Sequence, residues 1–121
     1  MRIRKLSDCK LIVAGDSTNL RELLHPKRTS GFHGGYSLAH ASLTHGTKSR
    51  KHRMKTDEVY YILSGTGEMH INEETAVVTA GDCIHIPPGS SQWIKNIGSD
   101  KLTFLCIVDP AWNANDEIIL E

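Results

Sequence analysis

Four side chains, His52, Met54, Glu58 and Gln92, have the residue types and the spacing that point to chemistry. His52 and Met54 stand two positions apart in a predicted strand, so both side chains point to the same face. Imidazole suits zinc, copper, iron and nickel, oxygen ligands suit manganese or magnesium, and a thioether favours copper(I). The set therefore mixes donors with different metal preferences.

These residues lie within two motifs of spaced glycine, proline and asparagine. The motifs are Gly46-x5-His52-x-Met54-x3-Glu58-x6-Gly65 and Gly81-x5-Pro87-x-Gly89-x2-Gln92-x3-Asn96. They resemble the two signature motifs of the cupin superfamily at every framework position. The resemblance implies an all-β fold, a double-stranded β-helix or jelly-roll barrel, in which these four positions converge on one divalent metal. The usual pattern has histidine at the Met54 and Gln92 positions, so the implied metal site is altered.

Two interpretations of this site are compatible with the sequence. In the first, His52, Glu58 and Gln92 hold iron, manganese, nickel, zinc or copper, and Met54 is a wall or a weak ligand. In the second, Met54 fills the cavity, and His52 and Glu58 form a polar pair that hydrogen-bonds a ligand or each other. Methionine is more often a gap filler than a ligand, which favours the second. Burying a histidine and a glutamate without a purpose is costly, which favours the first. We expect a metal to be weakly bound or absent.

Three further side chains are candidates for the pocket wall. Tyr60 shares a strand face with Glu58, because the two stand two positions apart. His40 and His85 lie in other predicted strands and are also considered as lining residues. In a metal-dependent enzyme, Tyr60 or His40 would be the candidate for proton transfer. No catalytic residue is assigned from the sequence.

The predicted elements divide the chain into three parts. Residues 1–35 are expected to form a strand at 10–14, a short helix suggested by the capping-box spacing of Asn19 and Glu22, and a loop, all packed on the barrel. Residues 36–110 are the barrel. Within it, a hairpin turns at 72–74, and 92–95 and 102–108 make a second hairpin. Residues 111–121 are an irregular tail whose Trp112 packs back on the barrel.

Composition limits the possible functions. A chain of 121 residues with 39% hydrophobic and 23% charged residues fits one globular domain. Its 14 basic and 14 acidic residues balance, which gives no argument for nucleic-acid binding. No apolar run approaches the length that spans a membrane. The three cysteines form no CxxC pair, which favours free thiols and a cytoplasmic location.

The expected function is a pocket for a small polar molecule. One hypothesis is a metal-dependent enzyme of the dioxygenase, isomerase or lyase type. The alternative is a non-catalytic, metal-free binding or sensor module. The resemblance also implies a homodimer, in which the run 11–14 could pair across the interface. Fold alone does not choose among these functions.

Overall fold

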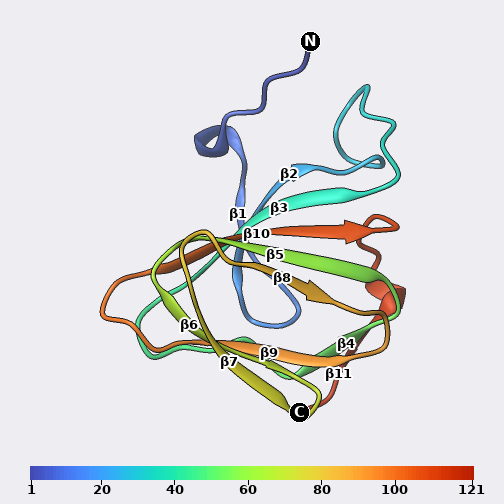
Figure 1. The fold of residues 1–121 in the computed structure, drawn as a ribbon. Helices are drawn as coiled ribbons and strands as arrows, with labels where there is room; N and C mark the ends of the chain where they lie inside the picture. The colour runs from blue at the N-terminus through green and yellow to red at the C-terminus, as the bar shows by residue number, and fades with distance from the viewer.

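The computed structural model describes residues 1–121 and shows two antiparallel sheets packed against each other (Figure 1). The first has six strands in the order β1-β2-β3-β10-β5-β8, and the second has five in the order β11-β4-β9-β6-β7. The strands are β1 (Leu11–Val13), β2 (Asn19–Leu24), β3 (Ser37–Leu43), β4 (His52–Met54), β5 (Asp57–Ser64), β6 (Thr66–Ile71), β7 (Glu74–Thr79), β8 (Cys83–Ile86), β9 (Ser91–Asn96), β10 (Leu102–Asp109) and β11 (Glu117–Ile119). Two short 3-10 helices are η1 (Leu6–Asp8) and η2 (Ala114–Asp116). The all-β jelly-roll class expected from the sequence is confirmed, although the two sheets do not close into one continuous barrel.

The expected helix near Asn19 is wrong, because this segment is the strand β2. It pairs with β1 on one side and with β3 on the other. This pairing on both sides decides the structure and overrides the capping-box spacing. Leu20 packs against the core, and Glu22 lines a cavity. The helical turn of the N-terminal part is η1, which lies earlier in the chain.

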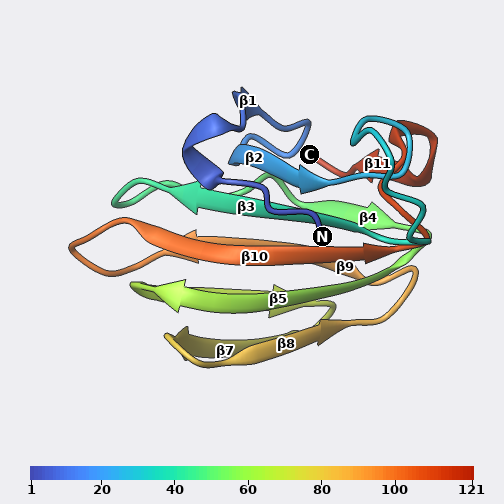
Figure 2. The ribbon, with the colours of Figure 1, turned by 90° about the horizontal axis from the view of Figure 1, so that it is seen from above.

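The two predicted hairpins have different outcomes. β6 and β7 pair in register across the turn at Asn72, as expected. β9 and β10 do not pair, because they belong to different sheets: β9 lies between β4 and β6, and β10 lies between β3 and β5. The connection after Asn96 therefore crosses from one sheet to the other, as Figure 2 shows from above.

The core lies between the sheets and takes side chains from both. Ile62 on β5 and Phe104 on β10 come from the first sheet, and Met69 and Ile94 come from the second. Alternation along β5 puts Glu58, Tyr60 and Ile62 on the inner face, so the same strand supplies the core and the wall of the cavity.

Truncating Ile62 to alanine is expected to lower the free energy of unfolding by about 2–5 kcal/mol, because the side chain is fully buried and leaves a cavity. Urea denaturation of the purified protein would measure the loss. Ile107→Ala is the matched control, since Ile107 is 38% exposed on the neighbouring strand and should cost much less. Equal losses at the two positions would contradict this account of the core.

The edge strand β1 exposes apolar side chains, with Leu11, Ile12 and Val13 all more than 40% exposed. The homodimer expected from the sequence would cover this edge, and it stays a prediction. No helix of the chain combines the length and the apolar character that crossing a membrane requires.

Candidate functional site

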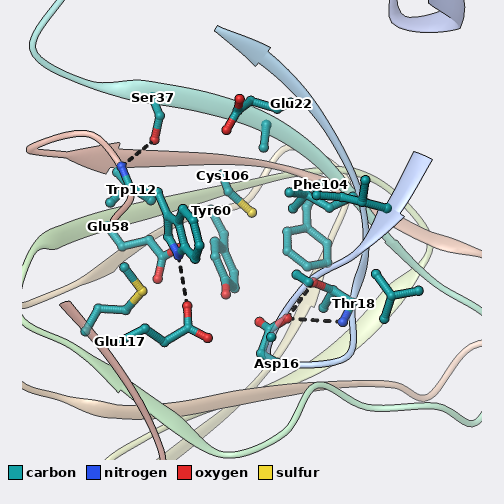
Figure 3. A pocket seen from close by; sticks show the side chains of 18 of the residues that line it. Asp16, Thr18, Glu22, Ser37, Glu58, Tyr60, Phe104, Cys106, Trp112 and Glu117 are labelled. Carbon is teal, nitrogen blue, oxygen red and sulfur yellow. Dashed lines mark hydrogen bonds between the residues drawn. The ribbon is translucent and has the colours of Figure 1, made fainter. Parts of the chain in front are cut away.

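A cavity of about 460 Å³ opens on the inner face of the six-stranded sheet. β3, β5 and β10 supply its inner walls, and β4 contributes His52 and Met54. The segments before and after the barrel complete it, with Asp16 from the turn after β1 and with Trp112 and Glu117 from the C-terminal segment (Figure 3). The cavity therefore depends on residues from both ends of the chain.

Gln92 links two residues of the cavity wall through its side-chain amide. Its Nε2 donates to Glu58 Oε1 at 2.8 Å, and its Oε1 accepts from Tyr60 Oη at 3.0 Å. All three side chains are buried. Gln92 does not itself line the cavity and lies behind Glu58 and Tyr60. It therefore fixes the positions of these two residues.

Glu58 is 6% exposed, and its burial raises the pKa of the carboxyl group to about 8 from an ordinary value of 4.5. Loss of solvation is the largest cause, because it disfavours the charged form. The hydrogen bond from Gln92 acts in the opposite direction, whereas the nearby carboxylates of Asp16 and Glu117 raise the pKa further. At neutral pH the Glu58 side chain is therefore mostly a neutral carboxylic acid that can donate a proton.

His52 is 2% exposed and has one ring nitrogen engaged. Its Nδ1 donates to the carbonyl oxygen of Arg50 at 2.8 Å, which leaves Nε2 unprotonated in the neutral ring. Nε2 lies 3.7 Å from Asp16 Oδ2, too far for a hydrogen bond but close enough to stabilise an imidazolium. Asp16 is held in place by Thr18, whose backbone N–H and hydroxyl both donate to Oδ1, at 3.1 and 2.7 Å.

The C-terminal segment covers one side of the cavity and is tied to the barrel by Trp112. The backbone N–H of Trp112 donates to Ser37 Oγ at 2.9 Å, and its carbonyl oxygen accepts from His25 Nε2 at 2.8 Å. The indole Nε1 donates to Glu117 Oε2 at 2.9 Å. β11 then pairs with β4, so the expected irregular tail contains a strand. Trp112 and Glu117 thereby become walls of the cavity.

The structure brings most of the sequence candidates together. His52, Met54, Glu58 and Tyr60 line one cavity, and Gln92 lies directly behind it. Asp16, Trp112 and Glu117 were missed as site residues, because they lie outside the two motifs. The expected packing of Trp112 against the barrel was the only sequence signal for them.

The prediction that His40 and His85 line the pocket is wrong, because neither side chain lies on the wall of this cavity. In β3, Ser37 and Ala39 face the cavity, so strand alternation turns His40 to the opposite face. His85 on β8 bonds Asp57 Oδ1 at 2.6 Å and faces a separate open groove beside β7. Both histidines therefore point to the outer face of the six-stranded sheet.

A divalent metal, which the family pattern implies, does not fit these donors. His52 offers a free ring nitrogen, but both ends of the Gln92 amide are engaged. Burial raises the pKa of Glu58, so a metal ion would have to displace the proton of this carboxyl group in order to bind. Met54 offers only a soft thioether. No group of three or more histidine, cysteine, aspartate or glutamate side chains is placed to hold a metal ion.

Comparison with known proteins agrees with the fold. Residues 39–108 match the family model described as the cupin domain. The chain therefore belongs to the cupin family.

An uncharacterized protein of Methanocaldococcus jannaschii is 40% identical over 113 residues, which cover 93% of this chain and 89% of that protein. The oxalate-binding protein of Thermotoga maritima is 32% identical over 89 residues, covering 72% of this chain and 74% of that protein. Among solved structures, a nucleoside dehydratase of Streptomyces superposes with a TM-score of 0.79 at 17% identity, covering 100% of this chain and 92% of that one. At this identity the likeness concerns the fold alone.

Proposed function

We propose that the cavity binds a small polar molecule without a metal ion and that Glu58 and His52 carry out proton transfer on it. The observation that carries the proposal is the position of Glu58, whose buried carboxyl group lies on the wall of a cavity of about 460 Å³, where burial raises its pKa to about 8. Environments that separate an acid from a base are the usual arrangement for acid–base chemistry near neutral pH.

The roles follow from the hydrogen bonds. Glu58 Oε1 is held by Gln92, and its second oxygen makes no hydrogen bond within the chain, so this oxygen can carry the proton and give it to a bound molecule. His52 Nε2 is the acceptor, because Nδ1 holds the ring proton, and Asp16 would stabilise the resulting imidazolium. Tyr60 acts as a positioning residue, because its hydroxyl group donates to Gln92. An isomerisation or an elimination of water needs one acid and one base of this kind.

A binding role without catalysis is the second candidate. It is favoured by the 32% identical relative of Thermotoga maritima, whose name describes the binding of oxalate. Both candidate functions use the same cavity. They differ in whether the bound molecule is chemically converted before it is released.

The proposal is tested by incubating the protein with a cell metabolite extract in the presence of a metal chelator and following all metabolites by mass spectrometry. We expect one compound to be replaced by an isomer or by a product lighter by one water. Glu58→Gln and His52→Gln should lower the rate by about 100-fold or more, the scale of general acid–base catalysis. His40→Gln, on the outer face, is the matched control and should leave the rate unchanged.

The outcomes separate the candidates. Retention of an unchanged compound would support the binding role. Conversion that disappears with the chelator and returns with added metal would contradict the metal-independent proposal.

A further inference from the structure

The carboxyl groups of Asp16, Glu58 and Glu117 come from three separate segments of the chain and surround one part of the cavity (Figure 3). Asp16 and Glu58 are buried, and Glu117 is half-buried. Glu117 Oε1 lies 3.1 Å from the position that a Cβ atom on Gly15 would occupy, so its tip reaches the turn that carries Asp16. The carboxyl groups of Asp16 and Glu117 thus lie near His52 and beside the neutral acid Glu58.

Four polar atoms in this part of the cavity make no hydrogen bond within the chain, and all except the protonated oxygen of Glu58 are acceptors. His52 and Glu58 are 2% and 6% exposed, yet His52 Nε2 and Glu58 Oε2 make no hydrogen bond within the chain. Asp16 Oδ2 and Glu117 Oε1 are also without a donor. Three of these atoms, His52 Nε2, Asp16 Oδ2 and Glu117 Oε1, are acceptors on residues that line the cavity, so a bound molecule that supplies hydrogen-bond donors would satisfy them.

The cations around the cavity do not form a comparable site for an anion. Arg28 is engaged by Glu22 through two hydrogen bonds of 2.6 and 2.8 Å. Arg4 donates to the carbonyl oxygen of Leu23 at 3.2 Å. Lys10 is exposed at the rim and has no such partner. An anionic ligand would therefore meet the charges of Arg4 and Lys10, both on exposed residues, and the carboxylates of Asp16 and Glu117 inside.

Apolar side chains, including aromatic rings, form a large part of the remaining wall. Trp112, Phe104 and Tyr60 face the cavity, together with the aliphatic side chains of Leu20 and Val108. A ligand that fills this space must therefore carry an apolar body behind its donor group.

We infer that the cavity binds a small primary or secondary amine in its cationic form, with Asp16 and Glu117 as the counter-ions of its ammonium group and the aromatic walls against its apolar body. An ammonium group supplies several N–H donors to these acceptors, and its charge balances the carboxylates. The inference rests on the proposed function in one respect, that the ligand binds without a metal. It adds the chemical class of the ligand.

The test compares three probes of similar shape by isothermal titration calorimetry at pH 7 with a metal chelator present. The probes are 2-phenylethylamine, 2-phenylethanol and 3-phenylpropanoate, which are cationic, neutral and anionic. We expect the amine to bind at least about tenfold more tightly than the alcohol, because hydrogen bonds between charged groups are the stronger ones, and the anion to bind most weakly.

Variants identify the counter-ions. The double substitution Asp16→Asn and Glu117→Gln should reduce the affinity for the amine to that for the alcohol, without changing the affinity for the alcohol. Asp57→Asn is the control, because Asp57 pairs with His85 outside the cavity. Circular dichroism would verify that each variant is folded.

Equal affinity for the amine and the alcohol, tighter binding of the anion, or no binding of any probe at millimolar concentration would overturn the inference. Of these results, metal-free binding of the alcohol or the anion would leave the proposed function intact. If a probe binds only after a divalent metal is added, the proposed function fails as well.

Discussion

Replacing Met54 and Gln92 together with histidine is expected to raise the affinity for divalent transition metals by on the order of 100-fold, the scale that changes around metal sites produce. The reason is the number of nitrogen donors. The natural chain offers one free imidazole nitrogen, on His52, and the double variant would offer three. Calorimetric titration with iron, manganese, nickel, zinc and copper(I) would measure both proteins.

The matched control is the single variant Gln92→Asn, which disturbs the amide that bonds Glu58 and Tyr60 without adding a nitrogen ligand. It should not gain affinity for a metal. If the natural chain binds a metal as tightly as the double variant, Met54 and Gln92 are genuine ligands and the metal-independent account is wrong. If neither protein binds a metal, His52 and Glu58 do not form the remainder of a metal site.

The second large effect concerns stability and pH. The Glu58 carboxyl has a pKa of about 8 in the folded protein and an ordinary value of 4.5 in the unfolded chain. Between these values the folded state holds the extra proton, so stability falls as pH rises. The stabilisation that comes from the protonated Glu58 is fully present below pH 4.5, the pKa in the unfolded chain, and is lost as pH rises through about 8, the pKa in the folded protein. The expected loss is roughly 1 kcal/mol for each pH unit between pH 5 and pH 8.

Glu58→Gln should remove this dependence, because the glutamine amide is neutral at every pH and can still accept the hydrogen bond from Gln92. Urea denaturation at several pH values would compare the variant with the natural protein. The difference isolates Glu58, since Asp16, Glu117 and His52 are present in both. The variant should be the more stable protein at pH 8. Glu74→Gln, at an exposed position, is the control and should follow the natural protein. If the free energy of unfolding changes with pH in the same way for Glu58→Gln and for the natural protein, the account is contradicted.

Local signals were sufficient for the barrel and for part of the site. Strand alternation placed Glu58, Tyr60 and Ile62 on one face and His52 and Met54 on one face of another strand. The family spacing predicted that His52, Met54 and Glu58 meet at one cavity, and all three line it. Both inferences depend on residues close together in the chain, or on a pattern that the family shares. Such features are readable without knowing which strands meet.

The remaining features depend on long-range pairing. Strand alternation shows that His40 and its sequence neighbours point to opposite faces of β3. Only the packing of the two sheets decides which of these faces lines the cavity. β2 is a strand because β1 and β3 lie beside it, and no capping pattern could reveal that. Asp16 and Glu117 meet the motif residues through segments outside the matched domain, and no spacing relates them.

The most direct test of the central claim is the protonation state of Glu58 itself. Carbon-13 NMR of protein labelled at the glutamate side-chain carboxyl would follow each carboxyl through a pH titration, and the signal missing from Glu58→Gln would identify the residue. The account predicts a midpoint of about 8, with a neutral acid at pH 7. A midpoint near the ordinary value of 4.5 would contradict it, because Glu58 would then be an ionised carboxylate able to ligate a metal.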